Sequence, residues 1–357
     1  MAKYSPDRTA VSSPTLPDSN DPPVLGLGSV LITGVGGIVG QGVLKSLAES
    51  PYRTIGADAS ESAPGIYAAN RGYLVPMAKD PRYVDRLLEI CASERVGFLF
   101  AGLDVELPLF ARAAGRFREA GVVPIVSSPD IVDLADDKLD TARFLESHGF
   151  PAPRTLELPG GDPADLGFPL VLKPRKGGSR SCGVYTVASE DELRYRMERI
   201  DTANYVAQEH IGGDEFTCGT ITFDGRCFGA IVMKRTLRDG DTHKAFVVRD
   251  SVIESHVRAV AEALKPFGPC NFQLRMRRGT PCIFDINPRC SGTTYCRTLA
   301  GFNEPLMTLN YLELGLLPSF EIRPISIFRY WKELVVEEAG VDEARRTGMV
   351  RDSGRRL

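Results

Sequence analysis

The sequence predicts two fold classes in succession, α/β in the first third of the chain and α+β in the rest. Up to about residue 130, short apolar runs typical of strands alternate with helical stretches, a pattern typical of βαβ units and a parallel sheet. Between residues 215 and 288, apolar runs are separated by the turn pairs Asp224-Gly225, Asp239-Gly240 and Arg278-Gly279. Turns of this kind between strand-like runs predict antiparallel hairpins.

The elements follow in order along the chain. In the first part, strands are expected at 29–33, 54–57, 97–101 and 123–126, with helices from the first turn to Leu47, at 83–93 and at 105–120. Asp136-Asp137-Lys138 then opens an amphipathic helix that ends at Gly149, with Pro151 just beyond. Further strands are expected at 169–174, 184–187 and 205–208, a helix at 190–199, and a helix at 252–264 that interrupts the antiparallel region.

Composition narrows the class of protein. With 357 residues, 43% hydrophobic and 25% charged, the chain can build two or three packed sub-domains of an ordinary globular enzyme. The net charge of −3 argues against a nucleic-acid partner, because phosphate binding needs a basic excess or a basic stripe. The local cluster Arg275, Arg277 and Arg278 is interpreted as the solvated face of a hairpin.

The sequence contains no apolar run of membrane-spanning length, and residues 1–25 predict a disordered tail that lacks the apolar stretch of a signal peptide. The eight cysteines form no CxxC pair and lie in or near apolar runs. We therefore expect a cytoplasmic protein without disulfides and without a membrane partner.

A glycine-rich turn, Thr33 to Gly40 (TGVGGIVG), follows the first predicted strand. It permits close backbone approach to an anion, and Asp58 ends the second strand, where a dehydrogenase places its ribose-binding acid. This favours a Rossmann-like domain and leaves an NAD-dependent epimerase or dehydrogenase as an alternative. None of the tyrosines has a lysine four residues later, although short-chain dehydrogenases need that pair. We interpret the domain as Rossmann-like without NAD.

The residues that bear chemistry lie after position 137. Lys173 ends an apolar strand and precedes a glycine-rich loop that includes Gly177, Gly178, Ser179 and Gly183, which is typical of a mobile phosphate clamp. Further along, the segment 208–215 (QEHIGGDE) places Glu209 and Glu215 at the two ends of a strand and turn, with His210 and Ile211 between them. That spacing suits one acid near an adenine amino group and another on a ribose.

A hairpin near residue 280 predicts a magnesium site. Asp285 and Asn287 are two residues apart on a strand and so project from one face, and the neighbouring strand can place Gln273 beside them. Phe284 and Ile286 are expected on the opposite, apolar face. Oxygen-bearing side chains together with phosphate oxygens suit Mg²⁺. Arg289 follows at once and can stabilise charge on a phosphoryl group in transfer.

The segments NFQ and FDINPRCSGTT resemble the metal-binding end of ATP-grasp enzymes, and they are most similar to the carbamoyl-phosphate synthase large-subunit branch. The resemblance covers residues 29–315. It implies a Rossmann-like pre-ATP-grasp domain at 26–130, a small lid domain at 131–207 and a large domain with the Mg–ATP site at 208–320. Composition separates these domains from the tail 1–25 and from a charged segment at 321–357, which is expected to be helical and suggests no chemistry.

The resemblance also implies roles for residues. Lys138 and Lys173 would contact phosphates, Glu209 and Glu215 the nucleoside, and Arg289 the reacting phosphate. The Mg²⁺ ligands would be Gln273, Asp285 and Asn287, and Mn²⁺ can substitute for the metal. The central ligand in such enzymes is usually Glu, so the shorter Asp285 is a departure, and it is the sequence support for the alternative of a non-catalytic nucleotide-binding module. The chain also has no internal repeat, which disfavours the two-step route to carbamoyl phosphate.

We therefore expect an ATP-dependent carboxylate–amine ligase with an acyl phosphate intermediate and small-molecule substrates such as amino acids; a homodimer is the default oligomer. Residues just after the metal strand are candidates for the acyl substrate: Ser291, Gly292, Thr293, Thr294 and Tyr295. Arg235, Lys244 and Arg249 are candidates for binding its carboxylate, with solvated strand charges as the equal alternative.

Overall fold

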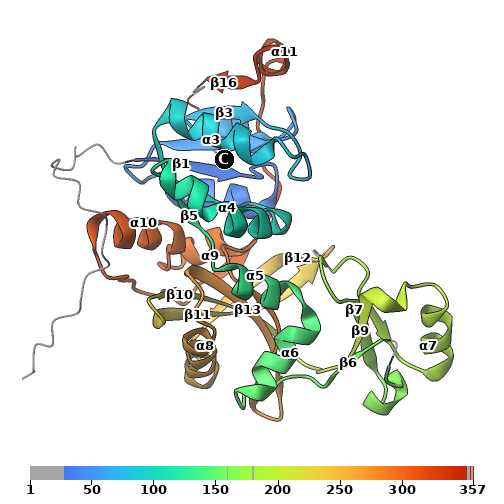
Figure 1. Cartoon of the computed structure of the whole chain (residues 1–357). Coiled ribbons are helices and arrows are strands. Elements are labelled where there is room, and N and C mark those ends of the chain that lie inside the picture. Colours follow the sequence, from blue (N-terminus) through green and yellow to red (C-terminus); the bar gives the residue numbers. More distant parts are fainter. Residues whose placement is uncertain (1–27, 159, 179–180, 352–353, 355–356) are drawn as a thin grey trace, which may run out of the picture.

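The computed structural model describes residues 28–158, 160–178, 181–351, 354 and 357. Within these residues the strands form three sheets. In Figure 1 the first lies at the top, the second below it and the third to one side, and we call them the front, large and lid sheets. The tail predicted at 1–25 lies outside the described residues.

The front sheet has the strand order β16-β3-β2-β1-β4-β5. Its parallel strands are β1 (Ser29–Thr33), β2 (Thr54–Asp58), β3 (Arg71–Leu74), β4 (Val96–Phe100) and β5 (Val123–Ile125). Its helices are α1 (Ile38–Leu47), α2 (Pro64–Ala68), α3 (Tyr83–Glu94) and α4 (Leu107–Glu119), with the 3-10 turn η1 (Asp104–Glu106) after β4. The predicted strands and helices are confirmed to within a few residues, whereas β3 and α2 were not predicted.

Strand order in the front sheet reverses between β1 and β4, which lie side by side. In open parallel sheets the ligand crevice lies outside the carboxyl ends of the strands at such a switch point. The segments that follow β1 and β4 are the glycine turn with the start of α1, and η1. The fold therefore directs these two segments toward any ligand held between the sheets.

Two helices, α5 (Pro129–Asp136) and α6 (Lys138–Ser147), lead to the lid sheet. The second begins where the sequence predicted, because the Asp137 side chain caps it by accepting the backbone N–H groups of Leu139 and Asp140 at 3.0 and 3.2 Å. The lid sheet, of order β6-β9-β7-β8, consists of β6 (Thr155–Glu157), β7 (Leu170–Pro174), β8 (Tyr185–Val187) and β9 (Tyr205–Glu209). It is accompanied by η2 (Pro163–Leu166), α7 (Glu190–Met197) and η3 (Thr202–Asn204).

The large sheet is antiparallel, of order β14-β13-β10-β11-β12-β15. Its strands are β10 (Glu215–Phe223), β11 (Arg226–Arg238), β12 (Asp241–Val248), β13 (Gly268–Arg277), β14 (Thr280–Asn287) and β15 (Ser326–Phe328). The predicted hairpin turns are confirmed: Asp224, Asp239 and Arg278 each adopt a positive φ and each precedes a glycine. The helices of this part are α8 (Ser251–Leu264), α9 (Thr294–Leu299) and α10 (Glu304–Leu314).

The two-residue period of the strands divides the large sheet into two faces. On β10 and β13, Cys218, Cys270, Phe272 and Leu274 are buried in one cluster with the apolar side of α8. Residues one position away, among them Thr217, point to the other face, where a cavity opens. Burial of the α8 face thus fixes which polar residues of these strands face the cavity.

The C-terminal segment differs from the expectation of a largely helical stretch at 321–357. It contains β15, which adds to the large sheet beside β12, then α11 (Glu338–Thr347), and then β16 (Met349–Arg351), which pairs antiparallel with β3 of the front sheet. Figure 1 shows α11 and β16 beside β3 of the front sheet. The segment therefore runs from one sheet to the other.

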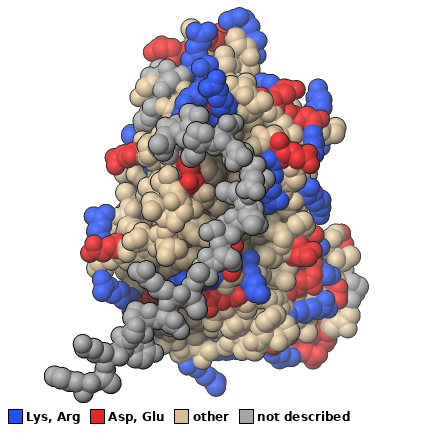
Figure 2. Space-filling model, turned by 60° about the vertical axis from the view of Figure 1, so that its left-hand side comes forward, with Lys and Arg blue, Asp and Glu red and all other residues tan. Residues whose placement is uncertain are grey.

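The surface seen in Figure 2 carries basic and acidic side chains interspersed, which agrees with the near-balanced sequence charge. Among the residues that the structure covers, none of the helices is both long enough and apolar enough to span a membrane.

Candidate active site

A cavity of about 380 Å³ lies where the lid sheet, the large sheet and the front unit meet. Its lining comes from β7 and β9 of the lid, from the open face of the large sheet, and from the start of α1 and η1 in front. The following sequence-predicted site residues line it: Lys138, Lys173, Gly178, Glu209, His210, Ile211, Glu215, Arg235, Gln273, Asp285, Asn287, Arg289, Ser291, Gly292 and Thr293. Residues far apart in the sequence thus converge on one space.

Lys138 and Asp285 form the ion pair nearest the predicted metal position. Lys138 is the first residue of α6, and its Nζ lies 2.6 Å from Asp285 Oδ1. Burial opposes the charge of both groups, yet their mutual attraction outweighs it: the pKa of Lys138 is raised and that of Asp285 is lowered. Asn287 Nδ2 donates to Asp285 Oδ2 at 2.7 Å. Asp285 is therefore ionised and held from two sides.

Lys173, on β7, has only neutral acceptors in contact. Its Nζ donates to Gln208 Oε1 at 2.9 Å and to the Phe284 carbonyl at 3.0 Å, and the residue is 7% exposed. Burial lowers its pKa to about 7, because desolvation outweighs the attraction of Asp285. A negatively charged ligand beside such a lysine would stabilise its protonated form.

The Phe284 carbonyl is available to Lys173 because β14 contains a bulge. Gln273 pairs with Asp285, but the next residue, Leu274, pairs with Ile283, so Phe284 is the extra residue. As a result Phe284 lines the cavity, while Ile283 and Ile286 are buried in the α8 cluster. The expectation that Phe284 and Ile286 share an apolar face was wrong, because the bulge shifts the alternation by one residue.

The two acids assigned to the nucleoside are engaged by arginines. Glu215 lies directly between Arg235 on β11 and Arg275 on β13, at 2.6 and 2.9 Å. Arg235 also donates to Gln273 Oε1 at 2.8 Å. Glu209 pairs with Arg277 at 2.9 Å.

These contacts correct the interpretation of the arginine cluster as a solvated face. Arg275 and Arg277 turn toward the cavity side and neutralise its acids, and only Arg278, at the hairpin turn, is exposed. Sheet register decides this, because antiparallel pairing places Arg275 opposite Glu215.

Arg289 is held by a residue that sequence reasoning missed. Its guanidinium lies 2.5 Å from Asp104 Oδ1 and donates to Asn287 Oδ1 at 3.1 Å. Asp104 stands in η1, just after β4 at the switch point of the front sheet, and it lines the cavity. The signal that could have found it is an acid three residues beyond the end of the predicted strand 97–101.

Buried Glu106 fixes the turn that carries Asp104. Its Oε2 accepts the backbone N–H groups of Gly102 and Leu103 at 3.1 and 3.0 Å and the Thr33 hydroxyl at 2.7 Å. A Cβ at Gly102 would lie 2.0 Å from the Thr33 carbonyl, so only glycine allows this approach of the two strand ends. The front sheet thus presents Asp104 from a rigid support.

The remaining predicted residues take different positions. In the glycine loop, Gly177 and Gly183 have positive φ and Gly177 N donates to Asp136 at 3.1 Å, while Ser179 lies outside the described residues. Thr294 is buried and donates to Glu304 at 2.9 Å. The exposed Lys244 is absent from the cavity lining, as are Thr294, Tyr295 and Arg249.

The residues predicted to hold Mg²⁺ fit such an ion together with phosphate. Gln273 and Asp285 are direct partners across β13 and β14, Asn287 lies two residues further, and all three line the cavity. They supply one carboxylate and two amide oxygens, which are hard donors. Within the described ranges no group of three or more His, Cys, Asp or Glu is placed to bind a metal by itself. Three donors leave the rest of the octahedral oxygen coordination of Mg²⁺ to other oxygens, such as those of phosphate or water.

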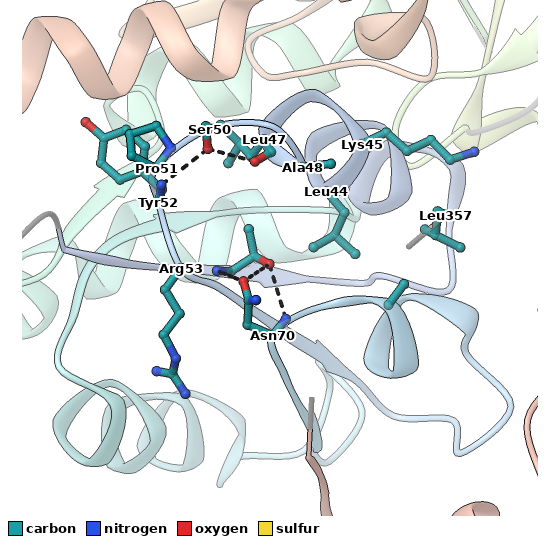
Figure 3. A pocket seen from close by; sticks show the side chains of 12 residues that line it. Leu44, Lys45, Leu47, Ala48, Ser50, Pro51, Tyr52, Arg53, Asn70 and Leu357 are labelled. Carbon is teal, nitrogen blue, oxygen red and sulfur yellow. Dashed lines mark hydrogen bonds between the residues drawn. The ribbon is translucent and has the colours of Figure 1, made fainter. Parts of the chain in front are cut away.

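The glycine turn before α1 is bonded to the protein itself. Asp58 Oδ2 accepts the backbone N–H of Gly36 at 2.7 Å, and Ile38 and Val39 at the start of α1 line the cavity. A second cavity, of about 340 Å³, lies in the front unit between α1 and β2 (Figure 3). Figure 3 shows Lys45 and Arg53 pointing away from each other there. None of the predicted site residues lines it.

Comparison with known proteins finds relatives of both parts of this chain. Residues 30–126 match the family model of the PylC-like N-terminal domain, and residues 201–324 match that of ATP-grasp in the biosynthetic pathway with Ter operon. The chain is thus similar to ATP-grasp proteins in sequence over residues 201–324 and in its fold. The expected ATP-grasp fold with a Rossmann-like front domain is confirmed.

Curated ATP-grasp relatives match parts of the chain. The carbamoyl phosphate synthase large chain of Acidobacterium capsulatum is 24% identical over 245 residues, covering 60% of this chain and 22% of the relative. The D-alanine–D-alanine ligase of Bacillus anthracis is 25% identical over 232 residues, covering 56% of this chain and 75% of the relative. This chain thus spans about a fifth of the synthase large chains that it matches.

Solved ATP-grasp structures share the fold at low identity. The N5-carboxyaminoimidazole synthetase of Staphylococcus aureus complexed with ADP has a TM-score of 0.67 at 18% identity, covering 83% of this chain and 80% of that one. The L-amino acid ligase of Bacillus licheniformis has a TM-score of 0.65 at 18% identity, covering 84% and 78%.

Proposed function

We propose that this protein is an ATP-dependent ligase that activates a carboxylate as an acyl phosphate and joins it to an amine, releasing ADP and phosphate. The observation that carries the proposal is the convergence of Lys138, Lys173, Asp285, Asn287 and Arg289 on one cavity. The cavity thus brings together cations for a polyphosphate and oxygen donors for Mg²⁺, as phosphoryl transfer requires.

We assign the nucleotide to the lid side of the cavity. Lys173 would contact phosphate. When the nucleotide enters, Lys138 would give up its ion pair with Asp285 and pair with phosphate instead. Gln273, Asp285 and Asn287 would hold Mg²⁺, which supplies positive charge against the phosphates. Glu209 and Glu215, with their charges balanced by arginines, would serve as acceptors for the nucleoside.

The chain's own residues supply positioning and electrostatics. Arg289, oriented by Asp104, would stabilise charge on the phosphoryl group as the substrate carboxylate attacks it in line. The amine then attacks the acyl carbon and displaces phosphate. Closure of the described loop residues Gly177, Gly178 and Gly183 over the site would exclude water. Ser291, Gly292 and Thr293 would contact the acid on the other side of the cavity.

We propose amino acids as the class of substrate. Two of the named relatives are a D-alanine–D-alanine ligase and an L-amino acid ligase, which supports amino-acid substrates.

The test is phosphate release from Mg–ATP with amino acids and small carboxylic acids, alone and in pairs. We expect release that depends on one pair and falls at least about 100-fold in Asp285→Ala, because removal of this carboxylate leaves the donor set without charge. Asp285→Glu, which retains the carboxylate, should keep a measurable rate.

The matched control is Asp241→Ala, which removes a carboxylate that lines the same cavity but is none of the proposed Mg²⁺ ligands. A rate in Asp285→Ala equal to that of the wild-type protein would overturn the assigned site. Absence of release from every pair, together with tight Mg–ATP binding, would replace the ligase by a nucleotide-binding module.

A further inference from the structure

The C-terminal segment, for which the sequence suggested no chemistry, reaches the substrate side of the cavity. β15 pairs with β12, and directly after β15 the backbone N–H of Arg329 donates to the His243 carbonyl at 3.1 Å. The pairing holds Arg329 beside the end of β12 that borders the cavity.

The Arg329 guanidinium bridges two cavity-lining stretches of backbone. Its NH1 donates to the Thr242 carbonyl at 3.2 Å, and its NH2 donates to the Gly292 carbonyl. NH2 also lies 3.5 Å from Cys296 Sγ. Both Thr242 and Gly292 line the cavity, so the Arg329 side chain links the start of β12 to the loop 291–293.

The same loop meets the front unit on its other side. A Cβ at Gly292 would lie 3.2 Å from Ile38 Cγ2 at the start of α1. Within the loop, Ser291 and Thr293 share a hydrogen bond of 2.8 Å between their hydroxyls. The loop is thus held between α1 and Arg329, and a shift of either support would move the two hydroxyls.

We propose that Arg329 is a positioning residue that fixes the substrate-binding loop 291–293 against β12. The proposal rests on the ligase function for the meaning of that loop, but its geometry does not depend on it. Arginine suits the role because its planar guanidinium offers several N–H donors in fixed directions, so it can serve two carbonyls at once. Its partners lie on the substrate side, whereas Lys173 and Glu209 belong to the lid.

The test compares Arg329→Met and Arg329→Lys with a matched control, Arg323→Met. Arg323 lies in the same segment and donates to the Leu299 carbonyl at 2.5 Å, but neither Leu299 nor Arg323 lines the cavity. We expect Arg329→Met to raise the KM of the acid or amine about tenfold or more while the KM of ATP stays within about twofold, because misplacement of a binding loop weakens positioning. Arg329→Lys should be intermediate, and Arg323→Met unchanged.

Hydrogen exchange gives a second readout that needs no turnover. Arg329→Met should speed exchange of amides in 290–296 and 241–243 but leave those of β7 and β9 unchanged, and Arg323→Met should not. If no substrate pair releases phosphate, the ligase proposal fails, and exchange still decides whether Arg329 holds the loop. Unchanged exchange in 290–296, or equal rises in the KM of ATP and of the other substrates, would overturn the positioning role.

Discussion

Lys173 and Lys138 project into the same cavity, but their surroundings differ. Lys138 is paired with Asp285 at 2.6 Å, whereas Lys173 contacts a side-chain amide and a carbonyl. Burial therefore lowers the pKa of Lys173 to about 7, while that of Lys138 is raised. With that pKa, Lys173 would be largely uncharged in the folded, ligand-free protein at pH 8, although an exposed lysine would keep its proton to about pH 10. A phosphate bound beside Lys173 would raise its pKa again and so restore the charge.

This predicts proton uptake when Mg–ATP binds. At pH 8 the wild-type protein should take up a fraction of a proton approaching one, and at pH 6 almost none, because Lys173 is already charged there. Calorimetry at pH 8 in two buffers of different ionisation enthalpy measures it as a buffer-dependent binding enthalpy. Lys173→Arg, which stays charged throughout, should show no such dependence. Equal enthalpies for the wild-type protein in both buffers would contradict the neutral state of Lys173.

At the scale of the elements, a fully buried ion pair holds polar residues that line the cavity. Arg297 on α9 and Glu304 at the start of α10 are 2.7 Å apart, and both side chains are 0% exposed. Arg297 also donates to Asn271 on β13 and to Thr217 on β10, the latter at 3.2 Å, and both of these residues line the cavity. The two helices thus fix polar side chains that the strands present to the site.

We expect Arg297→Met to lower the free energy of unfolding by roughly 3–5 kcal/mol, because it leaves the Glu304 carboxylate buried without a cation. Urea unfolding measures this. The double variant Arg297→Met/Glu304→Leu should recover much of the loss, since it removes the unpaired charge as well. A double variant as unstable as the single one would show that the cost comes from packing and not from charge.

At the scale of the whole molecule, the chain ends by returning to the sheet where it began. Val350 on β16 is 9% exposed and packs in the front core with Ala344 of α11 and residues of α1. The segment between β15 and β16 therefore connects the large sheet, with Arg329 beside the cavity, to the front sheet that carries Asp104.

Val350→Asp should lower the free energy of unfolding by roughly 2–4 kcal/mol, because it buries a carboxylate in an apolar cluster. Arg351→Asp is the matched control, since it places the same group at an exposed position of the same strand. Thermal unfolding of both variants beside the wild type measures the difference. Equal melting temperatures for the two variants would mean that β16 contributes little to the front core.

Local patterns were sufficient for most of the elements. The strand at 29–33, the Asp137 cap of α6 and the positive-φ turns before Gly225, Gly240 and Gly279 are confirmed, because each depends on neighbours in sequence. The ATP-grasp fold is confirmed as well. The site roles assigned to individual residues stay predictions, although most of those residues meet in one cavity.

The sequence by itself determined the order of most elements up to about residue 315, and which residue types could bind phosphate and metal, because periodicity and short motifs are local. Only the tertiary structure decided the partners: the bulge that turns Phe284 toward Lys173, the register that sets Arg275 against Glu215, and the strand ends that bring Asp104 to Arg289. The first two depend on the register between strands, which no local pattern encodes, and the third joins residues 185 positions apart in the sequence.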